Sequence, residues 1–172
     1  RGEVHLVQND LPSELFGYLA EEEGRSVVSA PGTNFSYLGF NLEDPVVGDL
    51  RVRRAIAHAI DREAIIRHLF RGRATLASSL FPPAHWLGLP LADHPHDIRR
   101  ARRLLADAGH TDQSPLQLEY KTSSDPFRLR VATILQAQLA RAGIRLELRS
   151  YDWGTFYGDI KTGNFQMYSL AW

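Results

Sequence analysis

Two hydrophobic periods alternate along this chain, and the longer of them predicts helices. Five predicted helices follow an aspartate that can cap a helix N-terminus: Asp49, Asp61, Asp97, Asp125 and Asp152. The last four of them run to a glycine that can end a helix: Gly72, Gly109, Gly143 and Gly163. A further amphipathic stretch opens at Pro12 and stops at Gly24. These signals predict six helices.

The shorter period, in which every second residue is apolar, predicts strands. The clearest cases are 116–120 and 144–148, which flank the predicted helix that begins at Pro126. A strand–helix–strand unit favours parallel pairing, so the pattern predicts a mixed α/β fold. We also expect strands at 35–41 and 165–172, and short strands near Val4 and Leu6 and at Val27 and Val28.

One segment carries neither period. Residues 78–95 contain four prolines, which exclude a regular helix or a central strand: Pro82, Pro83, Pro90 and Pro95. A long irregular segment inside a compact domain is usually functional or lies across a surface. We therefore expect residues 78–95 to be irregular.

Composition narrows the class of protein. The chain has 172 residues, 44% of them hydrophobic and 23% charged, which is typical of one soluble domain and excludes a disordered tail, a coiled-coil rod or collagen. There is no cysteine, which removes thiolate nucleophiles and cysteine-based zinc or iron–sulfur sites. The first residues, Arg1-Gly2-Glu3, contain neither an initiator methionine nor a signal peptide, so we expect an internal piece of a longer protein.

Metal, nucleic-acid, catalytic and cofactor sites find little support in the sequence. His85, His94 and His96 invite a metal hypothesis, but no carboxylate stands at the spacing of a helical zinc motif, so we expect no metal. Arginine-rich helices could bind nucleic acid, yet 20 basic and 20 acidic residues cancel. No nucleophile turn and no phosphate-binding glycine loop is present, so we expect no catalysis and no cofactor. A hydrolytic α/β enzyme and a nucleic-acid binder remain as alternatives.

Aromatic residues are the most informative class. They are concentrated at strand ends and at the start of one predicted helix: Phe35, Tyr37, Phe40, Trp153, Phe156, Tyr157, Phe165, Tyr168 and Trp172. Tyrosine and tryptophan combine a large apolar ring with a polar tip, which suits a pocket for a ligand of mixed polarity. Core packing is the alternative interpretation, and for Phe35, Phe156 and Phe165 it is the favoured one.

Six fragments, in order, resemble one known family. They are 34–42 (NFSYLGFNL), 49–56 (DLRVRRAI), 59–66 (AIDREAII), 81–86 with Phe81-Pro82-Pro83 and His85-Trp86, 101–109 ending in LLADAG, and 153–172 with Trp153, KTGNFQM and Ala171-Trp172. Together they resemble the signature of family 5 extracellular solute-binding proteins, the peptide- and nickel-type receptors of ABC importers. The resemblance covers essentially the whole chain.

The resemblance implies a two-lobed periplasmic receptor of the class II type, which closes on its ligand like a hinge. Residues 1–33 would leave the first lobe, and 34–172 would form the hinge-crossing strand and an incomplete second lobe. The implied partners are a peptide or similar small solute and an ABC permease, with no nucleic acid, no metal and no cofactor. We expect a periplasmic or membrane-tethered extracellular protein that is a monomer at full length.

The resemblance also implies which residues contact the ligand. Tyr37 and Gly39 alternate along one strand, so they share a face. Gly39 stands where some oligopeptide receptors have a carboxylate, so the ligand class is implied by the family alone. The expected contact residues are Tyr37, Gly39, Asn41, Trp153, Tyr157, Lys161, Ser169 and Trp172.

Overall fold

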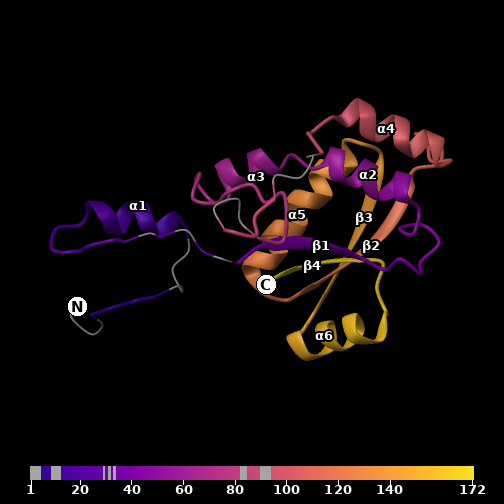
Figure 1. Ribbon diagram of the computed structural model, residues 1–172. Coiled ribbons are helices and arrows are strands. Elements are labelled where there is room, and N and C mark those ends of the chain that lie inside the picture. Colours follow the sequence, from indigo (N-terminus) through magenta and orange to yellow (C-terminus); the bar gives the residue numbers. More distant parts are fainter. Residues whose placement is uncertain are drawn as a thin grey trace.

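The computed structural model describes residues 5–8, 13–28, 30, 32, 34–81, 85–89 and 94–172. The side chains of residues 13 and 14 are outside this description. Six helices and four strands lie in the described part of the chain (Figure 1). The helices are α1 (Ser13–Glu21), α2 (Leu50–Ala59), α3 (Arg62–His68), α4 (Ile98–Asp107), α5 (Pro126–Ala140) and α6 (Trp153–Thr162). The strands are β1 (Ser36–Phe40), β2 (Leu116–Ser123), β3 (Ile144–Tyr151) and β4 (Met167–Ala171).

The four strands form one mixed sheet in the order β1-β4-β2-β3. β2 pairs in parallel with both β3 and β4, while β1 pairs antiparallel with β4. The β2–α5–β3 unit is the strand–helix–strand unit that the alternating pattern predicts, and its parallel pairing is confirmed. The mixed α/β class is confirmed as well.

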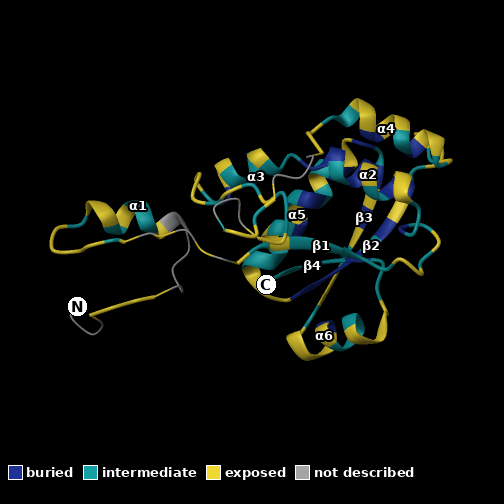
Figure 2. Ribbon diagram, viewed as in Figure 1, coloured by how far each residue is buried: buried dark blue, intermediate teal, exposed yellow. Residues whose placement is uncertain are grey.

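Helices lie on both faces of the sheet. α5 packs on β2 and β3, α2 packs on α5, and α4 packs on α2, whereas α6 lies against β2 and β3 from the opposite side (Figure 1). Figure 2 shows that buried residues concentrate in the sheet and in α2 and α5, while much of α6 is exposed. The sheet therefore has one thickly covered face and one that only α6 covers in part.

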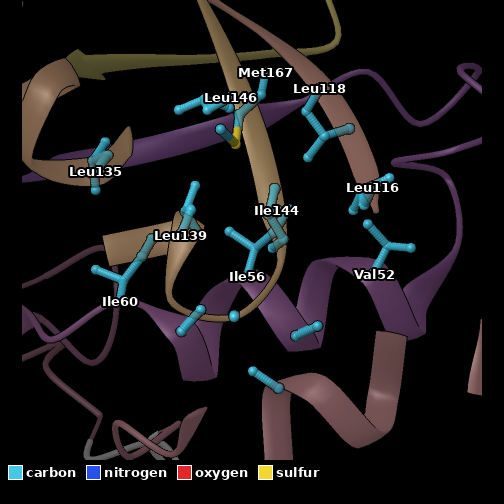
Figure 3. Close-up of a cluster of buried hydrophobic side chains, with 14 of the residues drawn as sticks. Val52, Ile56, Ile60, Leu116, Leu118, Leu135, Leu139, Ile144, Leu146 and Met167 are labelled. Atoms are coloured by element: carbon cyan, nitrogen blue, oxygen red, sulfur yellow. The ribbon is translucent and has the colours of Figure 1, made fainter. Parts of the chain in front are cut away.

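The hydrophobic core fills the space between the sheet and the helices α2 and α5. Every second residue of the strands points into it, as the period of two requires. Figure 3 shows the side chains of two helices and three strands meeting there: Val52, Ile56, Ile60, Leu135, Leu139, Leu116, Leu118, Ile144, Leu146 and Met167. The core fixes the orientation of the sheet, and hence which strand residues face α6.

The five predicted N-caps are confirmed. The carboxylates of Asp49, Asp61, Asp97, Asp125 and Asp152 each accept a hydrogen bond from a backbone amide in the first turn that follows. Gly163 ends α6 with a φ of 76°, a left-handed conformation that glycine adopts without steric cost. Local signals thus define where these helices begin and end.

Two predicted strands are wrong. Leu6, Val27 and Val28 are irregular, and Leu6 and Val28 are exposed, while Val4 lies outside the described residues. A strand needs a neighbouring strand for its hydrogen bonds, and the described sheet pairs neither segment. The prediction for 78–95 holds where that segment is described, since 78–81, 85–89, 94 and 95 contain neither helix nor strand.

Within the described residues, no helix has both the length and the apolar character that a membrane crossing requires.

Candidate functional site

The face of the sheet opposite the core carries two of the expected contact residues. On β1, Leu38 and Phe40 pack against the core, so Tyr37 and Gly39, which alternate with them, point to the other face. Gly39 pairs with Tyr168 of β4, and the Tyr168 ring lies directly over it. A Cβ atom on Gly39 would lie 2.3 Å from Cζ of Tyr168. The missing side chain at position 39 therefore makes room for this ring.

The Tyr168 ring is in contact with three further rings. Phe165 lies 4.9 Å away between ring centroids, Tyr37 6.2 Å and Phe156 of α6 6.5 Å, all with edge-to-face geometry. Burial raises the pKa of the Tyr168 hydroxyl, and the neighbouring Tyr37 raises that pKa further. Tyr168 therefore remains a neutral phenol that joins β1 to α6.

The close approach of Tyr168 to Gly39 yields a double-mutant prediction. Gly39→Ala alone should destabilise the protein by about 1–3 kcal/mol, because the new methyl displaces the ring from its contacts. With Tyr168→Leu already in place, the same change should be nearly neutral. Urea unfolding of the four proteins of the cycle measures this coupling. Equal effects of Gly39→Ala in both backgrounds would contradict this prediction, because the Tyr168 ring would then move aside without a loss of unfolding free energy.

α6 presents three of the expected residues on its exposed side. Trp153, Tyr157 and Lys161 are four residues apart and so share one side of the helix. The Trp153 and Tyr157 rings stack with centroids 5.5 Å apart and planes at 10°, and the Lys161 ammonium lies 6.0 Å from the centre of the Tyr157 ring. Trp153 is 58% exposed and Tyr157 44%, so both rings are available to a ligand.

Ring contacts join this side of α6 to β1. Phe35 stacks on Tyr37, and the Tyr37 ring contacts Tyr168. The Tyr168 ring contacts Phe156, which in turn contacts Trp153 with ring centroids 5.9 Å apart. We call this aromatic series Phe35, Tyr37, Tyr168, Phe156, Trp153 and Tyr157. It joins side chains that are more than 100 residues apart in sequence by continuous ring contacts, with Phe156 buried and Trp153 and Tyr157 exposed.

The remaining expected residues lie elsewhere. The Ser169 side chain is buried on the core face of β4, where its Oγ lies 2.5 Å from the Tyr120 hydroxyl. The Asn41 side chain donates to the Gly163 carbonyl and accepts from the Glu43 amide. Trp172 exchanges two backbone hydrogen bonds with Phe35, and its side chain is exposed. Ser169 thus lies on the opposite face of the sheet from Tyr37 and Gly39.

The structure adds a partly buried ion pair that the sequence analysis missed. Lys121 of β2 donates from Nζ to Asp159 Oδ2 of α6 at 2.8 Å. Burial lowers the pKa of Lys121, but the hydrogen bond and the charge of Asp159 outweigh it, and the net shift is upward. The hydrogen bond from Lys121 also lowers the pKa of Asp159. Both groups are charged at neutral pH. The only signal in the sequence was a lysine in an alternating strand of an arginine-rich chain.

Two hollows on the surface, of about 210 and 440 Å³, share Asp112 and Gly143 near the start of β2 and β3. Neither includes an expected contact residue. In the described part of the chain, no cluster of three or more histidine, aspartate or glutamate side chains is arranged to hold a metal ion.

Comparison with known proteins defines the class to which this fold and surface belong. The sequence profile of the bacterial extracellular solute-binding proteins, family 5, middle region, matches residues 1–172, and the chain belongs to this family. The dipeptide-binding protein of Escherichia coli is 27% identical over 100% of this chain and 33% of its own length. Di/tripeptide-binding protein 2 of Pseudomonas aeruginosa is 30% identical, with the same coverage. The chain spans about a third of the length of these relatives.

Solved structures agree with the sequence relatives. The periplasmic binding protein DppA of Helicobacter pylori, in complex with the peptide STSA, has a TM-score of 0.84 and 26% identity over 94% of this chain and 31% of its own. A dipeptide-binding protein of a Pseudoalteromonas species, in complex with Met-Leu, has a TM-score of 0.82 and 28% identity over 94% and 32%. The fold is thus that of one part of a family 5 binding protein.

Proposed function

We propose that the full-length protein is the solute-binding component of an ABC importer, which captures a peptide or similar small solute between two lobes and delivers it to a membrane permease. Membership of the family over the whole chain carries this proposal. The relatives are peptide-binding and heme-binding proteins, and the peptide binders are the more numerous among them. This proposal replaces the alternatives of a hydrolytic enzyme and a nucleic-acid binder.

The proposed division of the chain assigns 1–33 to the first lobe and 34–172 to the hinge-crossing strand and the second lobe. Apolar side chains exposed on the described part of 1–33 support it, because a soluble receptor would cover them with its first lobe. These side chains are Leu6, Val7, Leu15, Tyr18 and Val28. Residues 34–172, in contrast, hold the whole sheet and its core.

The proposed solute contacts are seven of the eight expected residues, led by Tyr37, Trp153 and Tyr157 on the aromatic series. Ser169 is not among them, because its side chain is buried on the core face of the sheet. Stacked rings beside the Lys161 ammonium would receive a solute that has both apolar and anionic parts. Contacts made by both lobes would favour the closed form, which the permease recognises. In this account the protein is a non-catalytic, monomeric receptor in the periplasm or tethered outside the cell, and it needs no cofactor.

Calorimetry on the full-length protein tests the proposal. Titration with the dipeptides Ala-Leu and Ala-Phe should give micromolar or tighter affinity for at least one, whereas residues 34–172 alone should bind weakly, since one lobe supplies only half of the contacts. Native mass spectrometry of protein purified without denaturation would identify a retained solute of another kind. A full-length protein that retains no solute and binds neither peptides, heme nor nickel chelates would contradict the proposal.

A further inference from the structure

Lys121 is a buried cation on the face of the sheet that α6 covers in part. Lys121 is only 4% exposed, whereas the side chain of Arg149, its register partner on β3, is 50% exposed. Both residues lie on the same face, but Lys121 is on the central strand β2 and Arg149 on the edge strand β3. Besides this place in the sheet, Lys121 is covered by contacts with α6 and with the residues on either side of that helix.

The ammonium of Lys121 contacts the chain at both ends of α6. It donates to Asp159 Oδ2 at 2.8 Å and to the Asn164 carbonyl at 2.6 Å, and it lies 5.6 Å from the centre of the Tyr151 ring. Tyr151 precedes the N-cap Asp152, and Asn164 follows the C-cap Gly163. Asp159 also accepts a hydrogen bond from the Asn164 side chain. One side chain of the central strand β2 thus holds the entry, the last turn and the exit of the helix.

α6 has little else to fix its orientation. Phe156 is its buried residue. Gly154 lies in the first turn of the helix and Gly158 in its interior, where a glycine costs about 1 kcal/mol relative to alanine. A short helix of this kind takes its position from tertiary contacts. The contacts available here are the Phe156 ring, the hydrogen bonds of Lys121 and the hydrogen bond that the Asn41 side chain donates to the Gly163 carbonyl at the end of the helix.

One side of α6 packs against the sheet, and the other side is exposed. Phe156 and Asp159, three residues apart, face the sheet, while Trp153 and Tyr157 are exposed. We infer that Lys121 is a positioning residue of the solute site: it holds α6 so that the Trp153–Tyr157 stack keeps its orientation toward the solute. This inference rests on the proposed function. Lys121 acts through the helix and need not contact the solute.

Fluorine NMR on the full-length protein labelled with 5-fluorotryptophan tests this role without any solute. Trp153→Phe identifies the Trp153 resonance by its disappearance. Lys121→Met leaves Asp159 as an unpaired charge and should lower stability, whereas Lys121→Met/Asp159→Leu removes both charges and should recover most of that loss. The matched control is Arg149→Met, which removes a cation from the same face whose ion pairs are with Glu147 and Glu119 of the strands and not with a residue of α6.

A positioning role predicts that the Trp153 resonance shifts or broadens in both Lys121 variants, including the one whose stability recovers. The Trp86 resonance and the Arg149→Met spectrum should stay as in the wild type. A Trp153 resonance that returns to its original position in Lys121→Met/Asp159→Leu would overturn the inference, because the ion pair would then contribute stability only. If Lys121→Met fails to fold, the double variant decides alone.

Calorimetry with the dipeptide that binds wild type best supplies a second readout. Affinity should fall about tenfold in both Lys121 variants and remain unchanged in Arg149→Met. Full affinity in the stable double variant would overturn the inference. If the wild type retains no solute and binds neither peptides, heme nor nickel chelates, the proposed function fails, but the Trp153 resonance still decides whether Lys121 positions α6.

Discussion

Replacing Phe156 by alanine is expected to lower the free energy of unfolding by about 3–5 kcal/mol, the largest loss expected from any side chain of α6. The ring is 1% exposed and contacts both Trp153 and Tyr168. Its loss leaves a cavity under a helix that contains two glycines. The few side chains on the face of the sheet that α6 covers cannot fill this cavity. Urea unfolding of the full-length protein measures the change, from the transition of the domain that contains this sheet.

Tyr157→Ala is the matched control for Phe156→Ala. It removes an aromatic ring from the next residue of the same helix, but this ring is 44% exposed, so the expected change in unfolding free energy is under about 1 kcal/mol. A loss for Phe156→Ala no larger than that of Tyr157→Ala would contradict the packing described for α6, since the buried ring would then contribute no more than the exposed one.

Local signals in the sequence predicted most of the fold. An aspartate with a side chain able to bond the first-turn amides, followed after the helix by glycine, defines α4, α5 and α6 almost to the residue. Strand predictions succeeded at 116–120 and 144–148, which pair with each other in the sheet, and failed at Val27 and Val28, which pair with none of the described strands. A strand depends on a partner that periodicity does not reveal.

The site was less accessible to sequence reasoning because it depends on register and on contacts between distant segments. Alternation placed Tyr37 and Gly39 on one face of β1. That face is the α6 side of the sheet, because their neighbours Leu38 and Phe40 pack against the core on the other side. Alternation could not show that Ser169 points to the core, because that depends on the pairing of β4 with β1 and β2. Nor could it join Lys121 to Asp159, which are 38 residues apart.

The Trp153→Ala/Tyr157→Ala double variant of the full-length protein is expected to lose solute affinity on the order of 100-fold. The two rings form the exposed end of the aromatic series, stacked within 5.5 Å of each other. Large rigid rings of this kind lose little entropy on binding, so their removal costs more affinity than most contact residues. Calorimetry with the best-binding dipeptide measures the loss.

This double variant is informative only if it changes contact with the solute without changing the stability of the protein or the position of α6. Both rings are partly exposed, so unfolding should change by less than about 1 kcal/mol, and the fluorine signals of the other tryptophans should stay in place. Trp86→Ala, which removes an exposed tryptophan of the proline-rich segment, should leave affinity unchanged. If the double variant binds as tightly as wild type while Trp172→Ala does not, the solute contacts the β1–β4 end of the sheet, and α6 serves as its support.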